Sequence, residues 1–345
     1  MKNIPLLILF ILCCGCEKIY FSADTANTPE NNFELFWKDF DKYYAQFGIR
    51  NMNWDSVYTA IKPKTTGISD KQLFDLLSDV VVKLNDMHVN IYSPHGSASW
   101  KGWGHGKYPC NKLINPCNYI ICGSSQNSAV FEYREFKNNN IGFLIINTFS
   151  GSVNGGTNLY DDRYYFIDNI LDKFKNKDGI IIDVRRNSGG NSMNAETIAS
   201  RFADKKRQSY RSRSKNGPGK NDFSDWKNYF IEPKGSFQFT KPVVVLTSRL
   251  TSSSAEHFVM YMNELPNVTI IGDTTGGGTG SPVFRELPNG WTYRLSTAYA
   301  ETADNKLVDS KGIVPDVTVQ TSVADSIAGV DRMIEKGLEI LKNKY

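Results

Sequence analysis

The sequence predicts an α/β core of buried strands and helices, preceded by a small helical module. From residue 141 onward, short apolar runs alternate with helical segments, a pattern typical of a largely buried sheet with helices on its faces. Residues 28–88 instead carry apolar side chains at helical spacing. The 345 residues suffice for one large domain or two modest ones, and 40% hydrophobic and 22% charged residues fit an ordinary globular protein.

The N-terminus predicts an export signal that ends in a lipidated cysteine. A basic start leads into the apolar run 4–12, which is shorter than the about 20 residues that a transmembrane helix needs. Cys16 follows closely and resembles the lipidation site of a bacterial lipoprotein, with Cys14 or an ordinary cleaved signal as alternatives. Residues 1–16 are therefore predicted as a lipoprotein signal peptide and 17–27 as a polar tether. The lipid would anchor the chain to a membrane of the bacterial cell envelope, facing the periplasm or the cell surface.

Residues 28–88 are predicted to form an N-terminal helical module. Thr28 before a proline begins a first helix, and Gly48 ends it. Ser69 with Gln72 has the spacing of a capping box at the start of a second helix. The apolar faces of the two helices, which we interpret as core, are Phe33, Phe36, Trp37, Phe40, Tyr43, Tyr44 and Phe47, then Leu73, Leu76, Leu77, Val80, Val81 and Leu84.

The connecting segment 89–140 holds all cysteines beyond the leader, namely Cys110, Cys117 and Cys122. Export permits disulfides, and three cysteines indicate one pair and one thiol, with the pairing left open. Together with His105 they could hold zinc, but their spacing fits no standard zinc motif, so we predict no metal.

The α/β core is predicted to span residues 141–345. Its strands are expected at 141–146, 179–184, 243–246, 268–272 and 291–295, and its helices at 160–174, 195–202, 258–265 and 323–341. Residues 205–240 are polar, basic and interrupted by Gly217-Pro218-Gly219, which predicts a loop or flap. We interpret it as a solvated loop or as a grip for an acidic substrate. The net charge of +4 is too weak to indicate a nucleic-acid partner.

A run of small residues, 251–256, lies between the apolar run 243–246 and the start of a helix. The first N–H groups of a helix are unpaired, and the helix dipole favours negative charge there. A serine in this turn therefore stands beside donors suited to a tetrahedral oxyanion. The same composition is also that of an ordinary helix cap.

Two further segments carry residues suited to acyl transfer. His88 leaves the second helix, and histidine is the side chain that takes a serine proton near neutral pH. Gly189 and Gly190 follow a buried strand, where glycine permits positive φ and a close backbone approach, so an N–H there could meet an oxyanion. The glycines 276–278 lack the Lys-Ser or Lys-Thr of a P-loop, and we interpret them as a mobile loop beside the site.

Taken together, these segments and Gly312–Asp316 resemble the C-terminal processing peptidases, or tail-specific proteases, which include the tricorn core and the interphotoreceptor retinoid-binding proteins. The resemblance covers nearly all of the mature chain. It implies a crotonase/ClpP-like core and a serine endopeptidase that acts on proteins or peptides without a metal or organic cofactor. The family's nucleophile stands three positions before the glutamate of the serine turn, which is Ser253 here. The implied oxyanion donors are the N–H groups of Ser254 and of Gly189 or Gly190.

The sequence departs from the best-known members in two respects. Gly278 stands where those members have a catalytic lysine, so no Ser–Lys dyad can form. The tricorn-like branch uses an upstream histidine, which matches His88, and a late acid that orients it, matched best by Asp309 and otherwise by Glu301. The segment 89–140 is too short for the PDZ domain that many members carry, so we predict no complete PDZ domain.

The resemblance implies hydrolysis of a peptide bond. Ser253 would attack the carbonyl while His88 takes its proton and later protonates the leaving amine. His257 is the rival base, because it lies one helical turn after Ser253, although it would approach from the buried side. The alternatives are a non-catalytic binding module for apolar ligands or peptides, and a crotonase-like enzyme acting on thioesters.

Overall fold

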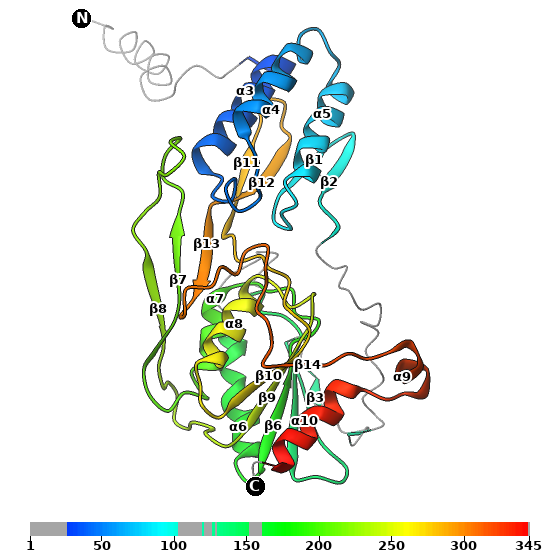
Figure 1. The fold of residues 1–345 in the computed structure, drawn as a ribbon, viewed down its shortest axis with the longest axis vertical. Helices are drawn as coiled ribbons and strands as arrows, with labels where there is room; N and C mark the ends of the chain where they lie inside the picture. Colours follow the sequence, from blue (N-terminus) through cyan, green and yellow to red (C-terminus); the bar gives the residue numbers. More distant parts are fainter. Residues whose placement is uncertain (1–25, 103–118, 121–125, 128–129, 152–160, 344–345) are drawn as a thin grey trace, which may run out of the picture.

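The fold was obtained as a computed structural model, which describes residues 26–102, 119–120, 126–127, 130–151 and 161–343 (Figure 1). The leader with Cys16, nearly all of the tether, and the cysteine group with His105 lie outside the described residues. Much of the connecting segment 89–140 also lies outside the described residues, so the prediction of no complete PDZ domain stays a prediction.

The core is a seven-stranded sheet in the order β14-β10-β9-β6-β5-β4-β3. Strands β14 to β5 pair in parallel, whereas β4 and β3 add an antiparallel edge. The strands are β3 (Gln126–Asn127), β4 (Phe131–Glu135), β5 (Ile141–Ile146), β6 (Gly179–Asp183), β9 (Val243–Thr247), β10 (Val268–Gly272) and β14 (Val317–Thr318). The predicted α/β core is therefore confirmed.

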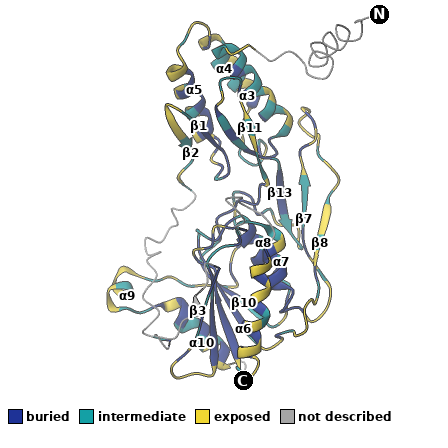
Figure 2. Cartoon of the chain, turned by 180° about the vertical axis from the view of Figure 1, so that it is seen from behind, coloured by how far each residue is buried: buried dark blue, intermediate teal, exposed yellow. Residues whose placement is uncertain are grey.

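Helices cover both faces of this sheet, as the dark strands between helices in Figure 2 show. Successive residues of a strand point to opposite faces. Ile180 and Ile182 of β6 accordingly pack with α6 (Ile167–Phe174), α7 (Ser192–Ala199) and α8 (Ser254–Asn263), whereas Ile181 packs with α10 (Arg332–Asn343). Burial on both sides explains the unbroken apolar run in the sequence.

The N-terminal module contains α3 (Pro29–Tyr43), α4 (Trp54–Ile61), the short 3₁₀ helix η1 (Lys62–Lys64) and α5 (Asp70–Lys83). The Thr28 hydroxyl caps α3, and Ser69 with Gln72 forms the expected capping box of α5. Helix α4 was not predicted, because its eight residues are too few for a clear apolar period, although Asn53 caps it.

The module is completed by a hairpin from the second half of the chain. Strands β11 (Pro282–Glu286) and β12 (Thr292–Ser296) join β1 (Asn90–Ser93) and β2 (Gly96–Ser99) in the order β11-β12-β1-β2. Tyr293 of β12 packs 5.2 Å from Phe36, between ring centroids. The prediction that 291–295 belongs to the core sheet was therefore wrong, because an apolar strand does not reveal which sheet it joins.

Residues 205–240 are not simply a loop. They hold β7 (Arg207–Ser214) and β8 (Lys227–Ile231), which form a three-stranded sheet with β13 (Ala298–Thr302), beside the junction of core and module in Figure 1. Basic side chains of this sheet contact acidic or aromatic partners. Arg211 pairs with Glu301 at 2.6 Å, and the Arg213 guanidinium lies 4.7 Å from the Trp226 ring centroid.

Two predicted helices are divided in the structure. The segment 160–174 contains a 3₁₀ turn, η4 (Asp162–Phe166), before α6. The C-terminal segment contains α9 (Val323–Ala328) and α10, separated at Gly329, which has φ 70° and ends α9. Amphipathic periodicity does not distinguish one long helix from two shorter helices with the same apolar face.

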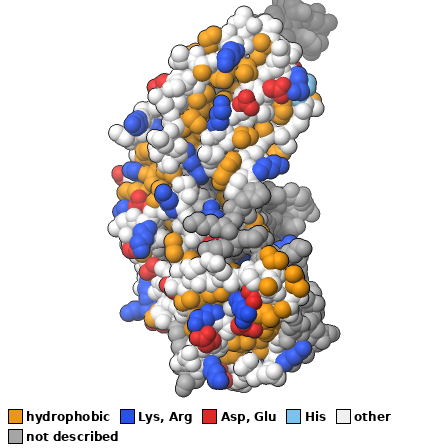
Figure 3. Space-filling view, turned by 45° about the vertical axis from the view of Figure 1, so that its right-hand side comes forward, with side chains coloured by type: hydrophobic (Ala, Val, Ile, Leu, Met, Phe, Trp, Pro, Cys, Tyr) orange, Lys and Arg blue, Asp and Glu red, His pale blue; other side chains and the backbone are white. Residues whose placement is uncertain are grey.

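The surface shows no concentration of positive charge in the view of Figure 3, where Lys and Arg are scattered among acidic, polar and hydrophobic side chains. In the part of the chain that the structure describes, no helix combines the length and the hydrophobicity needed to cross a membrane.

Candidate active site

Ser253 occupies a sharp turn between β9 and α8. Its φ of 56° and ψ of −126° lie in a region that non-glycine residues rarely adopt. Such a conformation costs on the order of 1–3 kcal/mol and persists only where the surroundings hold it in place. The residue is partly exposed at the start of α8, so its hydroxyl can be approached from outside while the helix N–H groups lie beside it.

The buried carboxylate of Glu256 holds this turn. Its Oε2 accepts the Ser253 N–H at 3.1 Å and the Gly278 N–H at 2.8 Å. Its Oε1 accepts the Gly277 N–H at 2.7 Å and the Thr275 hydroxyl at 2.5 Å. Burial raises the pKa of Glu256 to about 7, although these donors oppose the shift. One side chain thus ties the strained serine to the loop 276–278.

The two-glycine turn lies directly against the serine. A Cβ on Gly189 would fall 2.7 Å from Ser253 Cβ, and its φ of +99° also disfavours any side chain. The Gly189 N–H donates to the Asn187 side chain at 2.9 Å, whereas within the described residues the Gly190 N–H has no acceptor. Of the two glycines left open by the sequence, Gly190 therefore has the available donor. The Ser254 hydroxyl donates to the Gly190 carbonyl at 2.7 Å and fixes this turn to α8.

His88 follows α5 and is 7% exposed. Its backbone N–H donates to Asp86 Oδ1 at 2.9 Å, and Asp86 Oδ2 accepts from the Tyr44 hydroxyl at 3.0 Å. The ring Nδ1 is buried and has no partner among the described residues. Burial lowers the pKa of His88 to about 4, against the opposing charge of Asp86. The imidazole is therefore neutral at pH 7 and able to accept a proton.

Gly278 shows how the histidine segment meets the serine turn. A Cβ at Gly278 would lie 3.5 Å from His88 Cε1 and would clash with the Met87 sulfur. The Gly278 N–H shares the Glu256 carboxylate oxygen with the Ser253 N–H. The His88 ring is thus brought to the same short loop that Glu256 fastens to the nucleophile turn. A side chain at position 278 would require the Met87 side chain to move.

The two acids expected to orient the histidine have other partners. Asp309 accepts the Thr279 N–H at 2.8 Å, the Gln46 amide at 2.9 Å, the Ala300 N–H at 3.0 Å and the Thr279 hydroxyl. Burial raises its pKa to about 6, and among the described residues it makes no hydrogen bond to His88. Glu301 is paired with Arg211. This geometry does not show Asp309 in its predicted role of orienting His88. The Asp309 carboxylate instead links Thr279, β13 and the N-terminal module.

The rival base, His257, packs on the buried side of the site. Its ring stacks on Tyr210 with 4.9 Å between centroids and an interplanar angle of 4°. Burial lowers its pKa to about 4, and the charge of His88 acts in the same direction. The two histidines are therefore close enough to influence each other, and His257 lies on the β7 side of α8.

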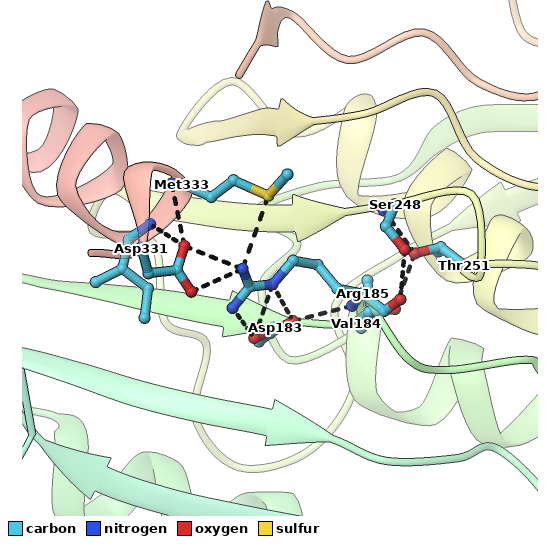
Figure 4. A network of polar contacts seen from close by, with 8 residues as sticks. Asp183, Val184, Arg185, Ser248, Thr251, Asp331 and Met333 are labelled. Carbon is cyan, nitrogen blue, oxygen red and sulfur yellow. Dashed lines mark hydrogen bonds and ion pairs between the residues drawn. The ribbon is translucent and has the colours of Figure 1, made fainter. Parts of the chain in front are cut away.

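A buried ionic network lies beneath the serine turn and the glycine turn (Figure 4). Arg185 donates to Asp183 at 2.6 Å and to Asp331, directly before α10, at 2.9 Å. Although burial alone would lower it, these carboxylates raise the pKa of Arg185. The Ser248 hydroxyl donates to the Arg185 carbonyl at 2.5 Å, and the Thr251 hydroxyl to the Val184 carbonyl at 2.8 Å, so the glycine turn and the serine turn are joined.

The model of peptidase family S41 matches residues 140–319, which include the serine turn and the glycine turn. The chain belongs to peptidase family S41. Carboxy-terminal processing protease CtpA of Bacillus subtilis (strain 168) is 34% identical over 188 residues, which is 54% of this chain and 37% of that protein. CtpB of the same organism is 25% identical over 42% of this chain and 28% of its own length. This S41 chain thus matches about a third of the length of the curated relatives, 37% of CtpA and 28% of CtpB.

Solved structures extend the similarity to nearly the whole S41 chain. A protein of Parabacteroides merdae assigned as a peptidase is 30% identical, with a TM-score of 0.81, over 92% of this chain and 97% of that chain. A lipoprotein from Streptococcus agalactiae shares the fold at 17% identity, with a TM-score of 0.60, over 93% and 98% of the two chains. The helical module and its hairpin are therefore part of a fold seen in S41-like structures.

Sequence reasoning assigned no structural role to three residues that shape this S41 site: Asp86, Asn187 and Glu256, the last of which served only to locate Ser253. Asp86 and Asn187 each bind the backbone N–H two residues later, a local pattern that Asp and Asn commonly form. Glu256 stands three residues after Ser253, the spacing at which a capping carboxylate reaches back. These signals were present in the sequence, but they identify turns and caps in general rather than a catalytic turn.

A metal site finds no support in the part of the chain that the structure describes. Within those residues, no group of three His, Cys, Asp or Glu side chains is placed to hold an ion. The acids of the site are each occupied by hydrogen-bond donors from the protein.

Proposed function

We propose that this S41 chain is a serine endopeptidase in which Ser253 is the nucleophile and His88 is the general base. The observation that supports this most is the environment of Gly278. The position where Ser–Lys members carry their base is glycine here, and an ideal Cβ at Gly278 would overlap the Met87 sulfur and lie 3.5 Å from His88 Cε1. This proximity supports His88 as the group that takes over the role of the lysine.

The proposed reaction gives each of these groups a role. Neutral His88 takes the Ser253 proton as the hydroxyl oxygen bonds to the peptide carbonyl carbon. The carbonyl oxygen becomes an oxyanion, which the Ser254 N–H and the Gly190 N–H stabilise. His88 gives its proton to the leaving nitrogen as the C–N bond breaks, and a water then hydrolyses the ester by the same route. The negative charge of Asp86 favours the transient imidazolium.

A fluorophosphonate probe tests the assignment directly, because it phosphonylates only an activated serine, whose oxygen displaces fluoride from the phosphorus. The wild type should be labelled and Ser253→Ala should not. His88→Ala should lower the labelling rate by at least about a hundredfold, the usual scale of general-base catalysis. His257→Ala is the matched control and should retain labelling. Loss of labelling in His257→Ala but not in His88→Ala would transfer the role of base to His257.

Endopeptidase action is tested with an internally quenched peptide blocked at both ends. Cleavage of the blocked peptide that is abolished by Ser253→Ala supports the proposal. A chain that binds peptides or apolar ligands tightly but neither cleaves nor labels would instead be the binding module considered from the sequence. Processing of thioesters without serine labelling would favour the crotonase-like alternative.

We also propose that the chain acts in a bacterial cell envelope, held by a lipid on Cys16. The support is the apolar run 4–12 followed closely by this cysteine. Metabolic labelling with a fatty-acid analogue in a bacterial host should mark the full-length chain, whereas Cys16→Ser should remain unmarked. Equal labelling of Cys16→Ser and loss of labelling in Cys14→Ser would move the anchor to Cys14.

A further inference from the structure

The sheet of the N-terminal module has one face that the helices do not cover. Directly paired residues of neighbouring strands share a face, so Asn90 of β1, Arg294 of β12 and Phe284 of β11 form one row. The intervening residues, such as Tyr293, face the aromatic core with α3. Phe284 is 61% exposed, and Tyr92, on the same face as Asn90, is 49% exposed.

Arg294 ties this open face to the proposed base. Its Nε–H donates to the His88 carbonyl oxygen at 2.7 Å. The Asn90 amide, turned so that its oxygen faces the guanidinium, accepts from Nη2 at 3.3 Å. The guanidinium also lies 5.8 Å from the Phe284 ring centroid. These contacts fix the cation beside the backbone of the residue that carries the imidazole.

Within the described residues this cation has no carboxylate partner within ion-pair distance. Of the other partly or fully buried arginines, Arg185, Arg201 and Arg211 each pair with an acid. Arg50, Arg213 and Arg249 show no acid partner among the described residues either, and Arg294 differs from them in its bond to the His88 carbonyl. Buried charges are normally paired because desolvation is costly. Burial lowers the pKa of Arg294, and the nearby Asp86 opposes that shift, but the oxygens of Asp86 are occupied by Tyr44 and by the His88 N–H.

The chemistry of the proposed reaction says which part of a substrate would lie here. His88 must reach the leaving nitrogen in order to protonate it. The protein surface beside His88 therefore contacts the part of the substrate that leaves with this nitrogen. An arginine there meets the leaving segment, and its forked donors match a carboxylate.

We propose that Arg294 is a specificity-determining residue that binds a carboxylate on the leaving segment of the substrate, with Phe284 and Tyr92 beside it for apolar side chains. This inference rests on the proposed peptidase function and on its assignment of His88. The carboxylate can belong to the C-terminus or to an Asp or Glu side chain, because both present the same two oxygens.

The test uses internally quenched peptide libraries and the full mature chain. The first library ends in a free carboxylate and has no acidic residue, the second is its C-terminal amide, and the third is the amide with Asp or Glu in the leaving segment. We expect the wild type to cleave the first or the third with a kcat/KM at least about tenfold above that of the second, the scale of one charge-assisted hydrogen bond. The library that gains the advantage identifies the source of the carboxylate.

Variants then assign the preference to the side chain. Arg294→Gln should reduce the ratio between carboxylate and amide libraries to about one, and Arg294→Lys should keep part of it, because lysine keeps the charge but not the fork. Arg332→Gln, an exposed arginine on α10, is the matched control and should keep the wild-type ratio. A wild-type ratio near one, or an unchanged ratio in Arg294→Gln, would overturn the inference.

Binding separates failure of this inference from failure of the peptidase proposal. Fluorescent versions of the three libraries can be titrated onto Ser253→Ala, which needs no catalysis. A tighter Kd for carboxylate peptides that disappears in Ser253→Ala/Arg294→Gln supports the Arg294 site even if the wild type cleaves nothing. Equal Kd values for all three libraries count against it even if the wild type is an active peptidase.

Discussion

Asp331 should contribute substantially to stability through the buried network in Figure 4. Its carboxylate accepts two contacts from Arg185 Nη1, at 3.1 and 2.9 Å, and also caps α10 by accepting the N–H groups of Met333 and Ile334 at 3.1 and 3.2 Å. Asp331→Asn keeps an oxygen for the cap but removes the charge facing Arg185. Asp331→Ala removes both functions.

The magnitudes follow from these contacts. A hydrogen bond to a charged group is worth about 1.5–3 kcal/mol, which we expect Asp331→Asn to lose from the free energy of unfolding. Loss of a helix cap adds about 1 kcal/mol, so Asp331→Ala should lose about 2.5–4 kcal/mol. Asp183 remains paired with Arg185 in both variants and limits the loss of free energy of unfolding.

Urea unfolding followed by tryptophan fluorescence measures both losses. Asp325→Asn is the control, because Asp325 caps α9 and pairs with Arg332 at the surface, where solvent screens the charge. It should lose less than either Asp331 variant. Equal stabilities of wild type, Asp331→Asn and Asp331→Ala would refute the view that this network holds β6 to α10.

Three further outcomes are expected. Gly278→Ala should slow fluorophosphonate labelling, because the new methyl overlaps the Met87 sulfur and displaces the histidine segment. Labelling at the wild-type rate would show that the loop adapts to the methyl without moving the histidine segment. Gly189→Ala should abolish labelling, since its Cβ would lie 2.7 Å from Ser253 Cβ at a φ of +99°, and a fully labelled variant would contradict the tight packing. Because burial lowers the pKa of His88 from 6.5 to about 4, its contribution to stability is complete above pH 6.5 and is lost as the pH falls through 4. The labelling rate should accordingly fall at acid pH with a midpoint well below pH 6.5. A midpoint at pH 6.5 would show that the imidazole is exposed.

Much of the core could be predicted from the sequence because its signals are local. The strands β6 and β9 are unbroken apolar runs, and the start of α5 carries a capping box that the structure reproduces. The serine turn and the glycine turn were also visible, because each consists of small residues directly after a buried strand.

The remainder depends on pairing at long range. Strand β12 has the composition of a core strand, and only the aromatic cluster around Phe36 determines that it joins the module. The hydrogen-bond partners of Asp309 come from three distant segments, so no local pattern could distinguish a loop anchor from an acid that orients histidine. Arg294 could not be singled out either, because its bond to the His88 carbonyl, and its lack of a carboxylate partner among the described residues, arise only in the assembled structure.

The pairing of β12 with β1 also bears on how the chain matures. Asn90 and Arg294 are neighbours in the sheet but come from opposite ends of the polypeptide, and such distant pairings slow folding. Until residues 282–296 have been made and delivered, the nascent N-terminal half presents an open strand edge and an uncovered aromatic surface, which are features prone to aggregation.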